Sequence, residues 1–295
     1  MGRLQTALAA SIALIVSTIA VATVAPAAAE PSIQPAGSVP IPDGPSPAWI
    51  VADLDTGQVL AGREMYTAHP PASTIKTLLA LTALDEVNLD YTVVATPADT
   101  EVECNCAGVK AGRAYTAHQL LEASLLVSGN DAANTLAAML GGFGPALAKM
   151  NAKAAAVGAT NTFATSPSGL DGPEGPGWTT PHDLAVIFRA AMANPVFAQI
   201  TGQPTAVFPT DTGQRALINQ NELLERYPGA VGGKTGFTNA ARKTFVGAAE
   251  RSGRRLVIAM MYGVVREGGP TYWDQAATLL DWGFAQDPTR GVATL

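Results

Sequence analysis

The sequence predicts a mixed α/β fold of the α+β type, in which one antiparallel sheet is built from both ends of the chain. Strand-like segments lie near both ends, at residues 49–61 and at residues 243–249 and 254–262. The segments between them show the apolar spacing and the capping signals of helices. This order suggests a single sheet with helices packed on its faces.

The first part of the chain predicts a hairpin and then helices. Strand-rich sequence flanks Asp55-Thr56-Gly57, and an apolar helix follows from Thr74. Residues 90–115 look irregular, with short strands around two cysteines. A capping box at residues 116–119 opens a helix that runs to Leu126. The turn at residues 128–130 then separates it from a helix over residues 131–140.

The second part predicts shorter helices and a second hairpin. A helix is expected at residues 151–157, followed by a Gly/Pro-rich loop at 165–179 and a helix that starts at Thr180-Pro181. Residues 251–253 join the two C-terminal strands. Thr271 caps a last helix, which we expect to run to Trp282 and to end at Gly283.

The N-terminus predicts export. Residues 1–29 combine one basic residue, a long apolar run and a small-residue end, which is typical of a secretory signal cleaved before Glu30. The alternative is an uncleaved membrane anchor, because the apolar run is nearly long enough to span a bilayer. Residues 30–48 are rich in proline and resemble a tether. Residues 49–295 then form the functional domain, on the periplasmic or cell-wall side of the cytoplasmic membrane.

Charge and cysteine content exclude several partners. The chain has 295 residues, is 47% hydrophobic and carries a net charge of −6 without a basic run. Nucleic acid and anionic lipid are therefore poor partners, and membrane contact is expected only if the N-terminal segment is retained. The C-x-C spacing of Cys104 and Cys106 is compatible both with two free thiols and with a local disulfide. A zinc site would need more ligands, so we predict no metal or cofactor and no catalytic role for the pair.

The segment PPASTIKTLLAL, residues 70–81, places a lysine one helical turn after a serine. Ser73 could simply cap the helix. Lys76 lies on the same face in the first turn, where the helix dipole disfavours a cation. A lysine in apolar surroundings has a lowered pKa and can act as a base, which would activate the neighbouring serine as a nucleophile. The pattern also occurs by chance, so it needs support from elsewhere.

Two later segments give that support. In LVSGNDAANTL, residues 126–136, Ser128 and Asn130 lie in a break between helices and can face a cleft, although such residues are also common in plain turns. In GAVGGKTGFT, residues 229–238, Lys234 and Thr235 can bind a carboxylate, and Gly236 allows a ligand to approach the strand closely. The alternative there is a glycine-rich turn before an edge strand.

With Ser-x-x-Lys, Ser-x-Asn and Lys-Thr-Gly in this order, the chain resembles the penicilloyl-serine transferases. It looks most like the low-molecular-weight, serine-type D-alanyl-D-alanine carboxypeptidases of the short actinobacterial kind. The resemblance runs from Trp49 to Phe284 and includes PSGLDG at residues 167–172. It implies a β-lactamase/transpeptidase-like fold with a helical subdomain. Many relatives carry a C-terminal β domain and a membrane anchor, but this chain stops soon after Phe284.

The resemblance also implies a role for each residue. Ser73 would attack the carbonyl of the penultimate D-alanine of a peptidoglycan stem peptide, with Lys76 as its base and Ser128 as the proton relay. Asn130, Lys234, Thr235 and Gly236 would bind the substrate, and Phe237 would supply a backbone donor to the oxyanion. Arg266 is a candidate for the substrate carboxylate, and β-lactams would acylate the same serine.

Three other functions are alternatives to this interpretation. A Ser-His-Asp hydrolase could use His69, His118 or His182, but no G-x-S-x-G elbow surrounds a serine. A class A β-lactamase needs a glutamate that drives deacylation, and the loop with Asp171 and Glu174 lacks its glutamate-to-asparagine spacing. A penicillin-binding sensor would acylate without turnover, although the intact motif residues argue against an inactive site.

Overall fold

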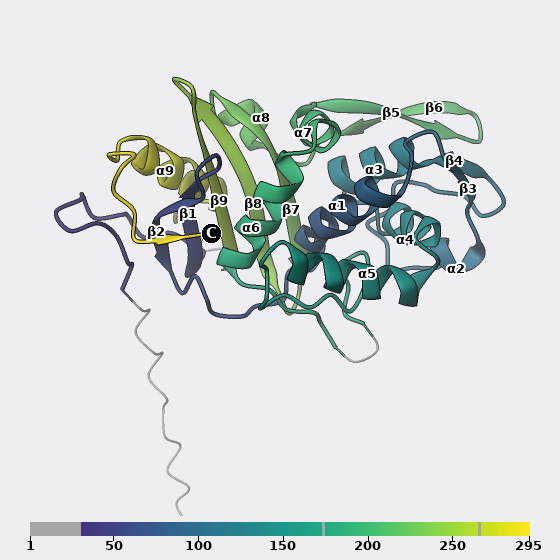
Figure 1. Ribbon diagram of the computed structural model, residues 1–295. Coiled ribbons are helices and arrows are strands. Elements are labelled where there is room, and N and C mark those ends of the chain that lie inside the picture. The colour runs from purple at the N-terminus through teal and green to yellow at the C-terminus, as the bar shows by residue number, and fades with distance from the viewer. Residues whose placement is uncertain (1–30, 173–174, 265–266) are drawn as a thin grey trace, which may run out of the picture.

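A six-stranded antiparallel sheet forms the spine of the molecule (Figure 1). The computed structural model describes residues 31–172, 175–264 and 267–295. The spatial order of the strands is β10-β2-β1-β9-β8-β7, so the two strands from the N-terminal part of the chain lie between strands from its C-terminal part. The bounds are β1 Ala48–Asp53, β2 Gln58–Arg63, β7 Ala230–Thr238, β8 Arg242–Arg251, β9 Arg254–Gly263 and β10 Ala293–Thr294. The predicted α+β class and two-ended sheet are confirmed.

The middle of the chain forms a helical lobe beside the edge strand β7 (Figure 1). Its elements are the 3₁₀ helix η1 Ala72–Ile75, α1 Lys76–Glu86, α2 Pro97–Thr100, α3 Ala117–Leu126, α4 Asn130–Met139 and α5 Phe143–Ala156. Two short hairpins join it: β3 Thr92–Val94 with β4 Ala114–Thr116, and β5 Thr205–Thr210 with β6 Gly213–Ile218. The remaining helices are α6 Pro181–Met192, α7 Pro195–Gly202, α8 Leu223–Arg226 and α9 Tyr272–Phe284.

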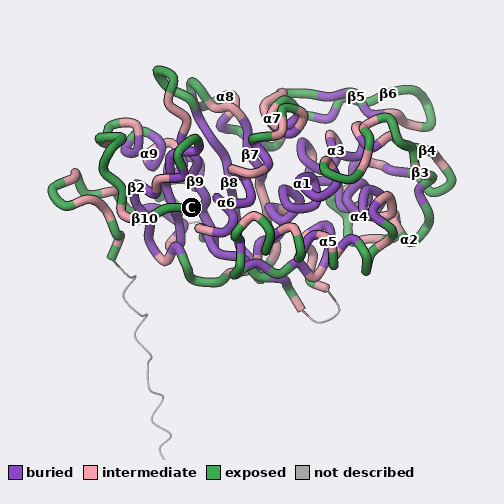
Figure 2. The backbone as a smooth tube through the Cα atoms, in the orientation of Figure 1, coloured by how far each residue is buried: buried purple, intermediate pink, exposed green. Residues whose placement is uncertain are grey.

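The sheet is buried on both faces, which explains its nearly continuous apolar strands (Figure 2). Alternate residues of β9 enter two separate cores: Val257 and Ala259 face the larger core with α6, whereas Leu256 and Ile258 face a second core under α9. Helix α1 is buried along its first eight residues and contacts α3, α4, α5 and α6. A helix that is apolar all round belongs at the centre of a lobe, and α1 holds this one together.

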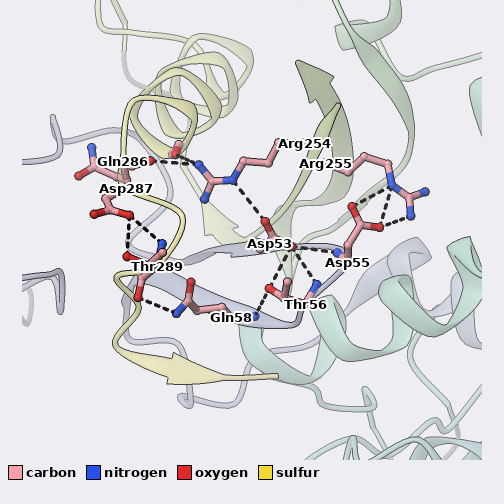
Figure 3. Close-up of polar contacts among 10 residues, drawn as sticks. Asp53, Asp55, Thr56, Gln58, Arg254, Arg255, Gln286, Asp287 and Thr289 are labelled. Carbon is pink, nitrogen blue, oxygen red and sulfur yellow. Dashed lines mark hydrogen bonds and ion pairs between the residues drawn. The ribbon is translucent and has the colours of Figure 1, made fainter. Parts of the chain in front are cut away.

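Polar contacts fasten the predicted first hairpin to the C-terminal part of the chain (Figure 3). Asp53 accepts hydrogen bonds from the backbone and hydroxyl of Thr56 and from Arg254 Nε at 3.2 Å. These donors hold the pKa of the Asp53 carboxyl below its usual range, against the opposing effect of burial. Beside it, Arg255 forms an ion pair with Asp55. These contacts, at the turn between β1 and β2, reinforce the pairing of the N-terminal strand β1 with the C-terminal strand β9.

Several predicted elements are confirmed with small shifts. The helices capped by Thr116, Thr180 and Thr271 begin where expected, and each threonine hydroxyl accepts a backbone hydrogen bond. The helix expected at 151–157 is longer, because α5 already begins at Phe143. Pro145 lies in the first turn of α5, where proline is tolerated.

Two expectations were wrong, one about Gly283 and one about the segment before β1. Gly283 does not end the last helix but lies within α9, where a Cβ would come within 2.8 Å of Leu256 and Val51 side chains. The glycine is there because helix and sheet pack closely. The short strands expected around the cysteines are present as β3 and β4, which flank residues 101–113, a segment without helix or strand.

The proline-rich segment before β1 is not a free tether. Ile33 pairs with Gly62, the Trp282 indole donates to the carbonyl of Val39, and Ser46 is fully buried. Polar groups of Ser46 exchange two hydrogen bonds with Gln275 of α9. This segment therefore packs against the domain over much of its length. The predicted signal, residues 1–29, lies outside the described residues.

Within the described ranges, no single helix is long and apolar enough to cross a bilayer. Helices α6 and α7 pass that test only as a pair, and they meet at an angle of 107°.

Candidate active site

Ser73 lies on η1, directly before the buried helix α1. Its side chain caps no helix, so the simple capping interpretation is wrong. The preceding Ala72 has a φ of 48°, in the left-handed region that non-glycine residues rarely adopt. Such strain persists only where the surroundings enforce it, and here Thr244 of β8 donates to the carbonyl of Pro71 at 2.9 Å. The sheet thereby fixes the position of the half-buried Ser73.

Lys76 is fully buried, and its Nζ lies 2.8 Å from Ser73 Oγ. Nζ also donates to Asn130 Oδ1 at 2.8 Å and to the carbonyl of Ser168 at 2.6 Å. A neutral amine has two hydrogens and one lone pair. Because the amide and carbonyl oxygens can only accept, they take both hydrogens and leave the lone pair to face the Ser73 hydroxyl.

The charge state of Lys76 favours this arrangement. Burial lowers its pKa well below the ordinary value, and the nearby Lys234 lowers it further, whereas the Asp131 carboxylate partly opposes the shift. A lysine with a strongly lowered pKa is an effective base near neutral pH. Geometry and electrostatics therefore both make Lys76 able to remove the proton of Ser73.

Ser128 and Asn130 lie where α3 gives way to α4, as predicted. Ser128 has a φ of 60° and is almost fully buried, and Asn130 begins α4. The tight turn leaves little space at Gly129, where a Cβ would lie 2.9 Å from the Ala107 side chain. The turn thus presents a hydroxyl and an amide on the same wall of the site.

Lys234 lies on the edge strand β7 rather than in a turn before it. Its Nζ donates to Ser128 Oγ at 2.9 Å and to the carbonyl of Thr235 at 2.8 Å. Complete burial lowers its pKa to about 7. Gly236 allows β7 to approach the nucleophile, since a Cβ there would be 2.9 Å from Ser73 N. Lys234 can therefore exchange protons through Ser128 near neutral pH.

These elements enclose one cleft between the edge strand and the helical lobe. It is lined by residues of η1, the 103–105 loop, the α3–α4 turn and start of α4, the loop between α5 and α6, the segment before α8, β7, β8 and α9: Ser73, Glu103, Cys104, Asn105, Ser128, Asn130, Leu170, Gln220, Glu222, Thr235, Gly236, Phe237, Lys243, Tyr272 and Trp273. The predicted Thr235, Gly236 and Phe237 all face it, and Phe237 is 58% exposed at its edge. Arg266 lies outside the described residues.

Sequence reasoning missed several contributors. The carbonyl of Ser168, in the PSGLDG loop, binds Lys76; Gly169 allows this contact, since its φ is +84° and a Cβ would overlap the carbonyl of Ala72. The PSGLDG stretch had been noted only as part of the family resemblance, without this role. Lys243 also lines the cleft, with Nζ 5.6 Å from the centre of the Tyr272 ring. It is paired with Phe237 across β7 and β8, a register that the sequence alone does not give.

The cysteines form a disulfide, which settles the alternative left open by their spacing. Cys104 lines the cleft, so the disulfide lies beside the catalytic groups. The three histidines lie elsewhere: none lines the cleft, and His182 contacts Asp183 and the carbonyl of Thr294. Glu174, the residue considered for a β-lactamase mechanism, is outside the described residues.

Comparison with known proteins gives a consistent picture. The sequence model of peptidase S11, described as D-alanyl-D-alanine carboxypeptidase, matches residues 36–264. The D-alanyl-D-alanine carboxypeptidase DacB2 of Mycobacterium tuberculosis is 73% identical over 90% of this chain and 92% of its own length. A D-alanyl-D-alanine carboxypeptidase from Streptomyces is 30% identical over 90% of this chain and 92% of its own length.

Solved structures show the same similarity. A crystal structure of D-alanyl-D-alanine carboxypeptidase from M. tuberculosis superposes with a TM-score of 0.88 at 73% identity, covering 89% of this chain and all of that one. A Streptomyces DD-transpeptidase superposes with a TM-score of 0.75 at 28% identity, covering 84% of this chain and all of the other. The transpeptidase-like fold expected from the three motifs is confirmed.

Proposed function

This chain belongs to the peptidase S11 family of D-alanyl-D-alanine carboxypeptidases, and we propose that it removes the terminal D-alanine from peptidoglycan stem peptides through an acyl-enzyme on Ser73. The observation that carries the proposal is the position of Lys76 Nζ. It lies 2.8 Å from Ser73 Oγ, with two other oxygens to accept its hydrogens. This arrangement provides an activated serine without a histidine.

Acylation follows from that geometry. Ser73 Oγ attacks the carbonyl carbon of the penultimate D-alanine, and its proton passes to the lone pair of Lys76. The oxyanion accepts hydrogen bonds from the backbone N–H groups of Ser73 and Phe237, and each such donor stabilises the transition state by about 3–4 kcal/mol. The bond to the terminal D-alanine then breaks and leaves an ester on Ser73.

The leaving amine needs a proton, and Ser128 is placed to supply it. Its hydroxyl receives a hydrogen bond from Lys234 at 2.9 Å, and Lys234 has a pKa of about 7. Ser128 can therefore pass a proton to the leaving amine and regain one from Lys234. Water then attacks the ester, its hydroxyl adds to the carbonyl carbon, and its other proton passes to Ser73 Oγ as the ester bond breaks. Lys76 loses its extra proton and Lys234 regains one by exchange with solvent, which closes the cycle.

Two groups are suited to the terminal carboxylate of the substrate. Thr235 presents its hydroxyl on β7, and Lys243 is a half-buried cation on the adjacent strand β8. Thr235 and Lys243 lie on the same face of the sheet, because Lys243 pairs with Phe237 two residues after Thr235. The carboxylate at the substrate's end is thereby distinguished from an internal peptide bond.

The same serine is proposed to be acylated by β-lactams, whose strained amide presents a carbonyl to the same donors. We also propose that the protein works outside the cytoplasmic membrane. Two features support export: the signal-like residues 1–29 and the Cys104–Cys106 disulfide, which is typical of oxidising compartments.

D-alanine release from a peptide ending in D-Ala-D-Ala tests the proposal. The purified protein should release D-alanine, and a Ser73→Ala variant should not. A wild-type protein that reacts with a labelled penicillin at Ser73 without releasing D-alanine would contradict the carboxypeptidase function and support a penicillin-binding sensor.

A further inference from the structure

The Cys104–Cys106 disulfide lies in a segment that directly holds an active-site residue. Residues 101–113 form neither helix nor strand, and Glu103, Cys104 and Asn105 line the cleft. Without the hydrogen-bond ladder of a regular element, such a segment owes its shape to local covalent and side-chain constraints. The disulfide joins positions only two residues apart, with their Cα atoms 4.9 Å from each other.

Two carbonyl groups, one within this small ring and one bonded to its first residue, bind Asn130. The carbonyl of Asn105, between the two cysteines, accepts from Asn130 N at 2.7 Å. The carbonyl of Glu103, bonded to the nitrogen of Cys104, accepts from Asn130 Nδ2 at 2.8 Å. The second contact determines which way the amide of Asn130 points, because its nitrogen faces Glu103 and its oxygen must then face Lys76.

The next residues of the loop are held by the neighbour of Asn130. Backbone N–H groups of Ala107, Gly108 and Val109 all donate to the Asp131 carboxylate at 2.8 Å. The Asp131 contacts anchor one end of the loop without the disulfide. Only the Glu103 and Asn105 carbonyls, which reach Asn130 itself, depend on the ring for their direction.

We propose that the disulfide is a positioning element for the catalytic lysine, acting through Asn130. The ring fixes the Glu103 and Asn105 carbonyls, these orient the Asn130 amide, and Asn130 Oδ1 takes one hydrogen of Lys76 Nζ. With that hydrogen held, the Lys76 lone pair stays directed at Ser73. The expectation from sequence that the cysteines play no part in the chemistry is revised accordingly.

The proposal rests on the proposed function, because its readout is acylation of Ser73. The test compares acylation by a fluorescent penicillin in the wild-type protein and in a Cys104→Ser/Cys106→Ser variant, with circular dichroism to show that both are folded. We expect the acylation rate constant to fall about tenfold, the rate equivalent of one well-placed hydrogen bond. The apparent affinity for the penicillin should change much less. Unchanged acylation in the folded variant would overturn the proposal.

A second comparison separates positioning from general loosening. In an Asn130→Ala background the disulfide has no amide to orient, so its removal should cause no further loss. An equal fractional loss in both backgrounds would show a purely structural effect and overturn the proposal. If the double cysteine variant did not fold, dithiothreitol would be applied to the folded wild-type protein. It donates two electrons and two protons to the disulfide, leaves two thiols and closes into its own cyclic disulfide.

The same experiment distinguishes two failures. A wild-type protein that no penicillin acylates would contradict the proposed function, and this inference with it. A wild-type protein that is acylated at Ser73 just as fast with its disulfide as without it would contradict the inference alone.

Discussion

Replacing Lys234 with methionine tests whether its burial sets the electrostatics of the site. Methionine has a similar length but no charge, so the variant removes the ionisation and retains most of the packing. In the folded protein Lys234 has a pKa of about 7, whereas a lysine in an unfolded chain titrates near 10.4. Between these values the unfolded state binds more protons than the folded state. The free energy of unfolding contributed by Lys234 therefore rises with pH in this window.

The magnitude follows from the size of the window. Each pH unit well inside it changes the free energy of unfolding by about 1.4 kcal/mol. Raising the pH by about two units, from about 7.5 to about 9.5, should therefore stabilise the wild-type protein relative to Lys234→Met by about 2–3 kcal/mol. The variant also loses hydrogen bonds to Ser128 and to the Thr235 carbonyl, but that loss does not change with pH. The pH dependence of the difference isolates the ionisation.

The assay is urea unfolding of both proteins at several pH values, followed by tryptophan fluorescence. Lys76 remains in both proteins, so its own contribution largely cancels. We expect Lys234→Met to be favoured most at the lower pH and its advantage to shrink steadily as the pH rises. A difference in stability that stayed constant across this range would show that Lys234 keeps an ordinary pKa, and would refute its role as a proton donor near neutral pH.

Three further substitutions have defined outcomes. Lys76→Met should abolish acylation by a labelled penicillin while the fold persists, because the Ser73 hydroxyl then has no base; normal labelling would disprove the base assignment. Lys243→Gln should raise KM for a peptide with a free terminal carboxylate about tenfold, through loss of one charged hydrogen bond, with little effect on kcat. Equal KM values for the variant and the wild-type protein would show that Lys243 does not bind the substrate carboxylate. Gly236→Val should lower the thermal midpoint and slow acylation, since a Cβ would lie 2.3 Å from Thr244 Oγ1 and 2.9 Å from Ser73 N; a variant as active as wild type would show that β7 can move aside.

The sequence was informative where chemistry needs a fixed spacing along one element. Ser73 and Lys76 lie one turn apart, and the break at residues 128–130 was visible from the turn residues between two apolar segments. Threonine caps gave the starts of three helices because a capping interaction is local. These features depend on neighbours in the chain and can be read without the fold.

Contacts across the fold were not predictable in the same way. The carbonyl of Ser168 reaches Lys76 from 92 residues away, and a backbone oxygen has no residue type to mark it. Lys243 enters the cleft because of the register between β7 and β8, which a sequence pattern does not determine. Gly283 showed the same limit, since a glycine can end a helix or admit a close neighbour, and only the packing decides between them.

Mass spectrometry of the trapped intermediate tests the central claim most directly. The purified protein would be mixed with benzylpenicillin, quenched in acid and digested, and the modified peptide sequenced. We expect one added penicilloyl group per chain, located on Ser73 and missing from both Ser73→Ala and Lys76→Met. An adduct on any other residue, or one that formed at the normal rate without Lys76, would contradict the serine–lysine mechanism.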